Sequence, residues 1–239
     1  MKIYATNAEV SDNQGSNAEI WEKIYASKEW GKYPSEAVIR FIARNFYNAP
    51  DRSKVRILEL GLGTGANLWF CAREGLGVSG VEWSRTGVER FKKRLEAEGL
   101  AGKICQLEVG DYLEKLDEFK DEGFDAWLDS YSLAYNDFEK SKKIIKKAMA
   151  KLRPGGKFLS ITPSFYNEGF VKDENLGHHC TKPTQGSDAF TGVIRYCDEA
   201  DLRELYEGEG FGISDIKIHI NKSLEKQLNE LYIVEGVKL

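Results

Sequence analysis

Residues 55–65 have the sequence VRILELGLGTG, a short apolar run that ends in glycines at every second position. The stretch that follows, 66–75, has apolar side chains at helical spacing and closes on Gly75, a typical helix stop. Strand, glycine loop and helix in this order predict the first unit of a parallel α/β sheet, because glycines let the chain turn tightly at the carboxyl end of a strand.

The same alternation continues along the chain. Further strands are expected at 77–83, 104–109, 124–130 and 157–162. Residues 84–99 are expected to form a helix with Ser84 as its N-cap, and 139–152 a helix that leads into a turn at 153–156. This alternation predicts parallel strands joined by right-handed crossovers, with helices on both faces of the sheet.

The end of the chain departs from this pattern. After a helical stretch at 199–210, two strands at 212–220 and 229–237 follow with no long helix between them, which favours an antiparallel hairpin. The predicted fold class is therefore α/β, with a Rossmann-like, mostly parallel seven-stranded sheet and an antiparallel terminal hairpin. The longest irregular segment, 163–191, is of a length that is usually functional or disordered.

Composition limits the classes of partner. With 34 basic and 38 acidic residues the net charge is -4, so no basic field supports a nucleic acid or an anionic membrane as partner. No apolar run approaches the roughly 20 residues that span a bilayer, and the opening residues lack the order of a signal peptide. The four cysteines include no CxxC pair, which favours reduced thiols. A cytoplasmic protein is expected.

His178, His179 and Cys180 are contiguous, a pattern that raises the question of a metal site. Adjacent side chains rarely converge on one ion, and no second pair of ligands follows at a useful spacing. No metal is therefore expected.

Acidic residues stand at the ends of three consecutive predicted strands. Glu82 ends the second strand, a position from which a carboxylate can accept both hydroxyls of a ribose. Together with Gly61 and Gly63 it also fits a nicotinamide dehydrogenase, and a tight turn without any ligand is the simplest alternative. Glu59 and Asp111 favour another ligand, because carboxylates there would repel a pyrophosphate and suit cationic, amine and hydroxyl groups. S-adenosylmethionine carries all three.

Five motifs resemble, in order, those of the class I S-adenosylmethionine-dependent methyltransferases. ILELGLGTG is similar to the glycine-rich first motif, VEWS to the ribose-binding strand end, and GDYLEKL to the adenine-contacting loop. FDAWLDSYSL resembles the fourth-strand motif beside the methyl donor, and LRPGGKFL the turn into the fifth strand. The resemblance covers roughly Val55 to the C-terminus, where the hairpin resembles the reversed seventh strand of the family. It implies a superfamily and not a substrate.

Carried over by position, the resemblance implies a role for each residue of the first two motifs. Gly61, Gly63 and Gly65 would line the methionine portion of the cofactor. Glu59 would order this loop or contact the cofactor through water, and Glu82 would hold the ribose.

The later motifs imply further contacts. Trp83 would pack on the adenine, and Asp111 with the backbone amide of Tyr112 would address the adenine edge. Asp129 or Ser130 would face the sulfonium. Two of these residues have simpler alternatives, since Trp83 is also typical of a packed core and Asp129 of a helix cap.

The N-terminal WEKIYASKEWGKYP stretch resembles the aromatic lid of small-molecule methyltransferases. It follows Ser16 and Glu19, which have the spacing of a capping box that starts a helix. Four rings would cover the sulfonium or the substrate, with Tyr25 and Trp30 assigned to the cofactor: Trp21, Tyr25, Trp30 and Tyr33. Aromatic faces attract cations by about 0.5–2 kcal/mol. The alternative is that these rings only pack the helices onto the sheet.

This reading divides the chain into a lid segment at 1–50 and a methyltransferase domain at 51–239, within one structural domain overall. Methyl transfer is an in-line displacement that needs no nucleophilic residue of the protein. A hydroxyl acceptor would benefit from a general base, and the candidates are Asp129, Tyr131, His178 and His179. The two histidines lie in the irregular segment where the family builds substrate pockets, although solvated loop histidines are an equal alternative.

The stretch 191–202 resembles the strand that borders the acceptor site in the family. Arg195 and Tyr196 would touch an acidic or sugar-like substrate there, unless Arg195 pairs with a surface carboxylate. The sequence therefore predicts a methyltransferase that acts on oxygen or nitrogen of a metabolite or sugar, with a homodimer left open. The alternatives are a protein or RNA methyltransferase, disfavoured by the missing basic patch, a non-catalytic cofactor-binding subunit, and the dehydrogenase.

Overall fold

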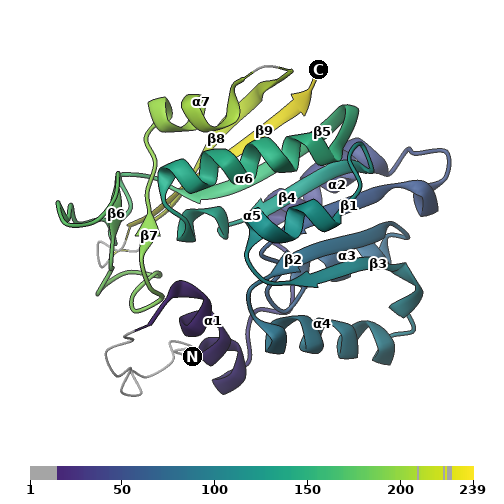
Figure 1. The fold of residues 1–239 in the computed structure, drawn as a ribbon, viewed down its shortest axis with the longest axis horizontal. Coiled ribbons are helices and arrows are strands. Elements are labelled where there is room, and N and C mark those ends of the chain that lie inside the picture. The colour runs from purple at the N-terminus through teal and green to yellow at the C-terminus, as the bar shows by residue number, and fades with distance from the viewer. Residues whose placement is uncertain (1–14, 209, 223, 225–227) are drawn as a thin grey trace.

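The computed structural model describes residues 15–208, 210–222, 224 and 228–239. Its centre is a seven-stranded sheet of order β3-β2-β1-β4-β5-β9-β8 (Figure 1). The strands are β1 (Arg56–Leu60), β2 (Gly77–Glu82), β3 (Ile104–Val109), β4 (Phe124–Ser130), β5 (Leu152–Pro163), β8 (Phe211–Lys222) and β9 (Leu228–Lys238). Strand β9 runs antiparallel to both of its neighbours, β5 and β8, whereas the pairs that join β1 to β5 are parallel. The predicted fold class, including the terminal hairpin, is confirmed.

Helices alternate with the strands as predicted. They are α1 (Asn17–Ser27), α2 (Glu36–Phe46), α3 (Ala66–Arg73), α4 (Arg85–Ala97), α5 (Tyr112–Lys115), α6 (Phe138–Lys151) and α7 (Glu199–Tyr206). Four 3-10 helices are η1 (Arg52–Lys54), η2 (Ala101–Lys103), η3 (Leu116–Glu118) and η4 (Leu133–Tyr135). None of the described helices is long and apolar enough to cross a membrane.

Two hydrophobic layers cover the two faces of the sheet. Successive side chains of a strand point to opposite faces, so neighbouring residues enter different layers. Leu58 and Trp127 pack in the layer that holds α6 and α7, whereas Ile57 and Leu128 pack in the layer that holds α2, α3 and α4. Because both faces are covered, β1 and β4 are buried along almost their whole length.

Two predicted boundaries are corrected by the structure. β5 begins at Leu152, five residues before the predicted start, and its register with β4 shifts near Phe124. Residues 153–156 are therefore an irregular start of the strand and not a separate turn. The segment predicted to be irregular also contains the short strand β6 (Cys180–Thr181), which pairs with β7 (Ile194–Arg195).

Helix α1 is fixed to two parts of the molecule beside the sheet. It starts with the expected capping box of Ser16 and Glu19. The Asn17 side chain donates to the carbonyl oxygens of Tyr135 and Val193 at 2.7 and 2.8 Å. Figure 1 shows α1 lying close to β7 and to the start of α4.

On its other side, α1 is held at the start of α4. The Glu22 carboxylate accepts hydrogen bonds from the Ser84 hydroxyl and from the backbone and hydroxyl of Thr86. Ser84 is also the predicted N-cap of α4, where its hydroxyl accepts from the Gly87 amide. Helix α1 is thus held across the carboxyl edge of the sheet.

The last glycine of the first motif generates a stability prediction. Gly65 has φ +80°, and a Cβ there would lie 2.0 Å from the ring of Phe91. Gly65→Ala is expected to destabilise the fold by about 2–4 kcal/mol, because both backbone strain and overpacking oppose it. Gly99→Ala is the matched control, since Gly99 has φ +70° but open space around it, and should cost only about 1 kcal/mol. Equal losses in urea unfolding would contradict this account.

Candidate functional site

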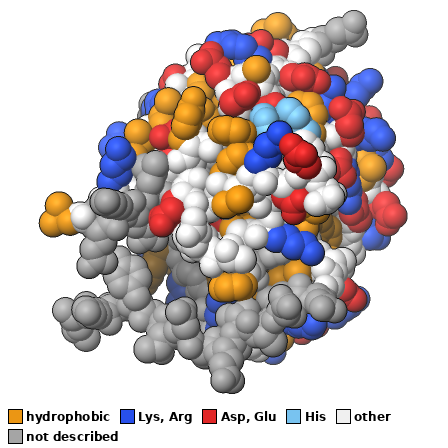
Figure 2. Space-filling view, turned by 90° about the vertical axis from the view of Figure 1, so that its left-hand side faces the viewer, with side chains coloured by type: hydrophobic (Ala, Val, Ile, Leu, Met, Phe, Trp, Pro, Cys, Tyr) orange, Lys and Arg blue, Asp and Glu red, His pale blue; other side chains and the backbone are white. Residues whose placement is uncertain are grey.

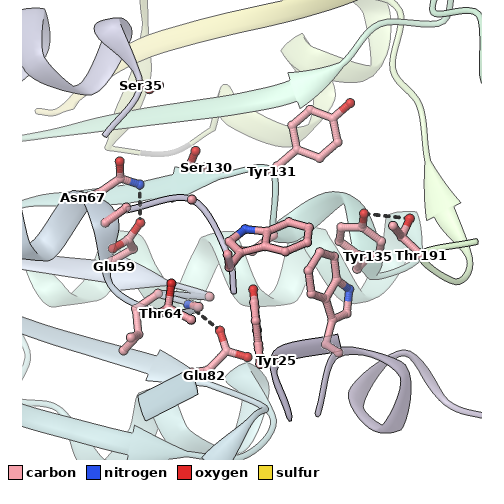
Figure 3. Close-up of a pocket in the computed structure, with 18 of the residues that line it drawn as sticks. Tyr25, Ser35, Glu59, Thr64, Asn67, Glu82, Ser130, Tyr131, Tyr135 and Thr191 are labelled. Atoms are coloured by element: carbon pink, nitrogen blue, oxygen red, sulfur yellow. Dashed lines mark hydrogen bonds between the residues drawn. The ribbon is translucent and has the colours of Figure 1, made fainter. Parts of the chain in front are cut away.

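A cavity of about 480 Å³ opens at the carboxyl edge of the sheet. Parallel strands end at the same edge, so the ends of β1, β2 and β4 converge there. Figure 3 shows its two sides. The glycine end is formed by Glu59, Glu82 and residues 61–64, and the tyrosine end by Tyr131, Tyr135, Asp188 and Thr191. The predicted Gly65 does not line the cavity, because it faces Phe91 of α4.

Glu59 lies fully buried at the glycine end. Its Oε1 accepts a 2.6 Å hydrogen bond from the Asn67 amide of α3, whereas its Oε2 has no partner within the described residues (Figure 3). Burial raises the pKa of Glu59 to about 8. A buried oxygen without a partner fits a donor group supplied by a ligand.

Glu82 connects the glycine loop to β2. Its Oε2 accepts from the Gly63 amide at 2.7 Å, and its Oε1 accepts from the Ser84 amide at 2.9 Å. Burial raises the pKa of Glu82, although these backbone hydrogen bonds lower it. Each carboxylate oxygen has a second lone pair, so the carboxylate can hold the loop and still accept from hydroxyl groups.

The residues expected around the adenine are only partly brought together. Trp83 and Tyr112 line the cavity and stack on each other at 5.0 Å between ring centroids, with 4° between their planes. Only the other face of Trp83 can therefore receive a further ring. Asp111 does not line this cavity, because its carboxylate caps the Leu113 amide and pairs with Lys140.

Asp129 is buried behind the cavity and not on its surface. Its carboxylate accepts hydrogen bonds from the amides of Ser132 and Leu133 and from the Ser160 hydroxyl. The alternative interpretation as a cap thus describes its place in the structure. Ser130 and Tyr131, the next two residues, line the cavity instead.

Tyr131 is held in an unusual backbone conformation, with φ +76°. Its hydroxyl donates to Asp188 at 3.0 Å. Burial, with Asp188 beside it, raises the pKa of Tyr131, which keeps the phenol protonated near neutral pH. Tyr131 is therefore a hydrogen-bond donor here and is poorly suited as a general base.

The four N-terminal rings all line the cavity: Trp21, Tyr25, Trp30 and Tyr33. Three of them, Trp21, Tyr25 and Trp30, contact one another at 5.3–5.8 Å between ring centroids. Trp21 also contacts Tyr135 edge-on at 5.0 Å. The rings therefore pack together and face the cavity at the same time.

His178 and His179 lie away from this cavity, in a second hollow near the start of α7. Both rings bond the Asp201 carboxylate at 2.7 Å, and their centroids are 3.8 Å apart. The face in Figure 2 shows histidine side chains at the surface beside acidic ones. The expectation that adjacent histidines do not converge is wrong here, because φ +53° at His179 turns the chain so that both rings reach Asp201.

Arg195 and Tyr196 do not reach the cavity surface either. Arg195 is completely buried, where it donates to the Cys197 thiol at 2.6 Å and to the Ser141 hydroxyl at 3.4 Å. It therefore pairs with no surface carboxylate. The Tyr196 hydroxyl donates to Asp188 at 3.2 Å from behind the tyrosine end.

Several residues that line the cavity were not predicted from the sequence. Asn67 and Tyr135 lie outside the glycine pattern and the strand ends, and Asp188 and Thr191 lie in the segment expected to be irregular. Tyr135 and Thr191 are joined by a 3.0 Å hydrogen bond (Figure 3). No local pattern marks these positions, since they meet only through the fold.

Glu59 generates a prediction for the pH dependence of stability in the ligand-free protein. Its pKa of about 8 in the folded state exceeds the ordinary value of 4.5, so its contribution to stability is complete below pH 4.5 and decreases as the pH rises through 8. Glu59→Gln cannot ionise. Relative to the wild type it should gain on the order of 3 kcal/mol between pH 5.5 and 8.5 in urea unfolding. A difference that is constant with pH would contradict burial of an ionisable Glu59.

Comparison with known proteins identifies a family for part of the chain and relatives of its fold. Residues 57–156 match a family described as "Methyltransferase domain". No curated protein matches the chain.

Solved structures with the same fold are distant in sequence. A structure reported for the conversion of a disulfide bond into a thioacetal group during echinomycin biosynthesis has 18% identity and a TM-score of 0.67, over 92% of this chain and 91% of that chain. A SAM-dependent methyltransferase from Methanosarcina mazei has 17% identity and a TM-score of 0.62, over 83% and 97%. A geranyl diphosphate methyltransferase in complex with GPP and sinefungin has 13% identity and a TM-score of 0.62, over 84% of this chain and 76% of that chain.

At these identities the solved structures support the fold alone, and the family match identifies residues 57–156 as a methyltransferase domain. With the glycine loop, the strand order and the reversed β9, they agree with the resemblance of the motifs. Residues 57–156 thus match a methyltransferase domain, and the chain shares its fold with a solved S-adenosylmethionine-dependent methyltransferase.

Proposed function

We propose that this protein is an enzyme that transfers the methyl group of S-adenosylmethionine to an oxygen or nitrogen atom of a small molecule. The observation that carries the proposal is the partnerless Glu59 Oε2, buried beside the glycine loop and across from Glu82. S-adenosylmethionine has an amine that can donate hydrogen bonds to Glu59 and ribose hydroxyls that can donate to Glu82.

The glycine end provides the contacts that this cofactor requires. Gly61 and Gly63 would lie along its methionine portion, whereas Gly65 would support the loop from behind, against Phe91. A Cβ at Gly63 would lie 2.7 Å from the Tyr25 hydroxyl, so the close approach of Tyr25 to this loop requires glycine. Trp83, which lines the cavity, would pack on the adenine. S-adenosylmethionine supplies a methyl group on a positively charged sulfur, ready for displacement.

The protein's own contribution to the reaction is alignment and exclusion of water. Ser130, at the end of β4, and Tyr131, at the tyrosine end, both line the cavity and would position the acceptor. Trp21 and Tyr25 would shield the charged sulfur, since aromatic faces attract cations. The lid role of α1 fits its attachment through Asn17 to the tyrosine end and through Glu22 to α4.

A small acceptor fits the size and the cover of the cavity. Its volume of about 480 Å³ lies within the range of pockets for small ligands. Helix α1 and residues Ser187, Asp188 and Thr191 border it, which leaves little room for a folded macromolecule. The net charge of -4 gives no support to an RNA acceptor. A cytoplasmic location and a homodimer remain predictions.

Calorimetric titration with S-adenosylhomocysteine, S-adenosylmethionine and NAD tests the proposal. Micromolar binding of the first two, without binding of NAD, is the expected result. Glu82→Ala should weaken S-adenosylhomocysteine binding roughly 10- to 150-fold, because it removes a charged acceptor worth about 1.5–3 kcal/mol.

Glu96→Ala is the matched control, because Glu96 is an exposed carboxylate on α4 that does not line the cavity. It should leave the affinity unchanged. Binding of NAD alone would reject the proposed function. Wild-type affinity in Glu82→Ala would reject the ribose contact only, and turnover of a small acceptor would exclude a purely cofactor-binding subunit.

A further inference from the structure

Asp188 is a buried carboxylate at the tyrosine end of the cavity. It is 5% exposed, and it belongs to the segment between β6 and β7. Its Oδ2 accepts hydrogen bonds from the hydroxyls of Tyr131 and Tyr196 at 3.0 and 3.2 Å, and its Oδ1 accepts from Ser187 at 3.2 Å. Every one of these donors is neutral.

Among the residues that the structure describes, no positive charge compensates this carboxylate. Asp188 forms no ion pair within the described chain, whereas most other buried acidic side chains lie near backbone amides or basic groups. The cavity lining contains three carboxylates, those of Glu59, Glu82 and Asp188, and neither lysine nor arginine. A buried charge that lacks a partner of opposite charge is costly. The cavity therefore favours a ligand that carries a positive charge.

The three carboxylates are divided between the two ends of the cavity. Glu59 and Glu82 lie beside the glycine loop, where the proposed function places the cofactor. Asp188 lies at the other end, next to Thr191, whose hydroxyl donates to the Asp188 carbonyl at 2.7 Å. One carboxylate thus remains for the acceptor.

We propose that Asp188 binds the acceptor and that the acceptor is an amine, which enters as an ammonium ion. This inference rests on the proposed function and narrows its acceptor from oxygen or nitrogen to nitrogen. The ring of Tyr135, which borders the same end, adds an aromatic surface beside the cation. An anionic acceptor would meet repulsion from Asp188, and a neutral alcohol would leave its charge uncompensated.

The reaction at this site is balanced in protons and electrons. An ammonium ion has no lone pair, so it first transfers a proton to the Asp188 carboxylate. Burial raises the pKa of Asp188, which favours this transfer. The amine lone pair then forms the new N–C bond while the S–C bond breaks, and that electron pair remains on sulfur as a neutral thioether. The product leaves as a methylated ammonium ion, and Asp188 releases its proton to solvent.

Tyr131 and Tyr196 are positioning residues in this arrangement. Both hydroxyls reach Oδ2, so they hold the carboxylate plane from two sides. Oδ1 accepts only from the hydroxyl of the adjacent Ser187. The lone pairs that remain on Oδ1 suit the N–H groups of an ammonium ion.

The test uses three probes of one shape: benzylammonium, benzyl alcohol and benzoate. Each is titrated by ligand-observed NMR into the full-length protein saturated with S-adenosylhomocysteine. The wild type should bind benzylammonium at least about tenfold more tightly than benzyl alcohol, and benzoate most weakly, because a charged hydrogen bond discriminates by that amount. Asp188→Asn should reduce the preference to within about twofold without changing the affinity for S-adenosylhomocysteine.

Asp173→Asn is the matched control, since Asp173 is an exposed carboxylate between β5 and β6 that does not line the cavity. It should keep the wild-type preference. Equal binding of the alcohol, absence of benzylammonium binding, or a preference that survives Asp188→Asn would overturn the inference. If Asp188→Asn does not fold, the wild-type comparison of the three probes still decides. Failure to bind S-adenosylhomocysteine would instead reject the proposed function.

Discussion

The link between Glu82 and the glycine loop is the interaction on which the cavity depends. One carboxylate accepts from the amide of Gly63 and from that of Ser84, so it fixes the loop after β1 to the end of β2. The loop can follow this path only because its glycines adopt positive φ. Glu59 lies on the other side of the same loop with an oxygen that no described group satisfies. The fold thus retains the buried Glu59 carboxyl group with one unpaired oxygen, which lowers its stability.

The other end of the cavity is built from parts that are distant in sequence. Asn17 on α1 bonds the carbonyls of Tyr135 and Val193, and Tyr131 at the end of β4 bonds Asp188. The helix before the sheet, the turn after β4 and the segment before β7 are thereby joined. The glycine end is formed by strand ends that belong to the shared fold, whereas the tyrosine end is formed by these long-range contacts.

The fold could be predicted from sequence because apolar periodicity, caps and glycines are local signals. The third and fourth strands begin and end where the sequence predicts, and Ser84 caps the expected helix. The site was only partly predictable. Strand-end positions identified Glu59 and Glu82, but they could not distinguish a cavity residue from a cap, as Asp129 and Asp111 illustrate. Long-range contacts, such as those of Asp188, leave no local pattern at all.

We propose that Glu59 is protonated in the ligand-free protein and binds the amine of the cofactor. Calorimetry of S-adenosylhomocysteine binding at pH 6.5, in buffers of different ionisation enthalpy, measures the protons released on binding. Because the pKa of Glu59 is about 8 in the free protein, the wild type should release close to one proton and Glu59→Gln none. Binding without proton release in the wild type would contradict the account.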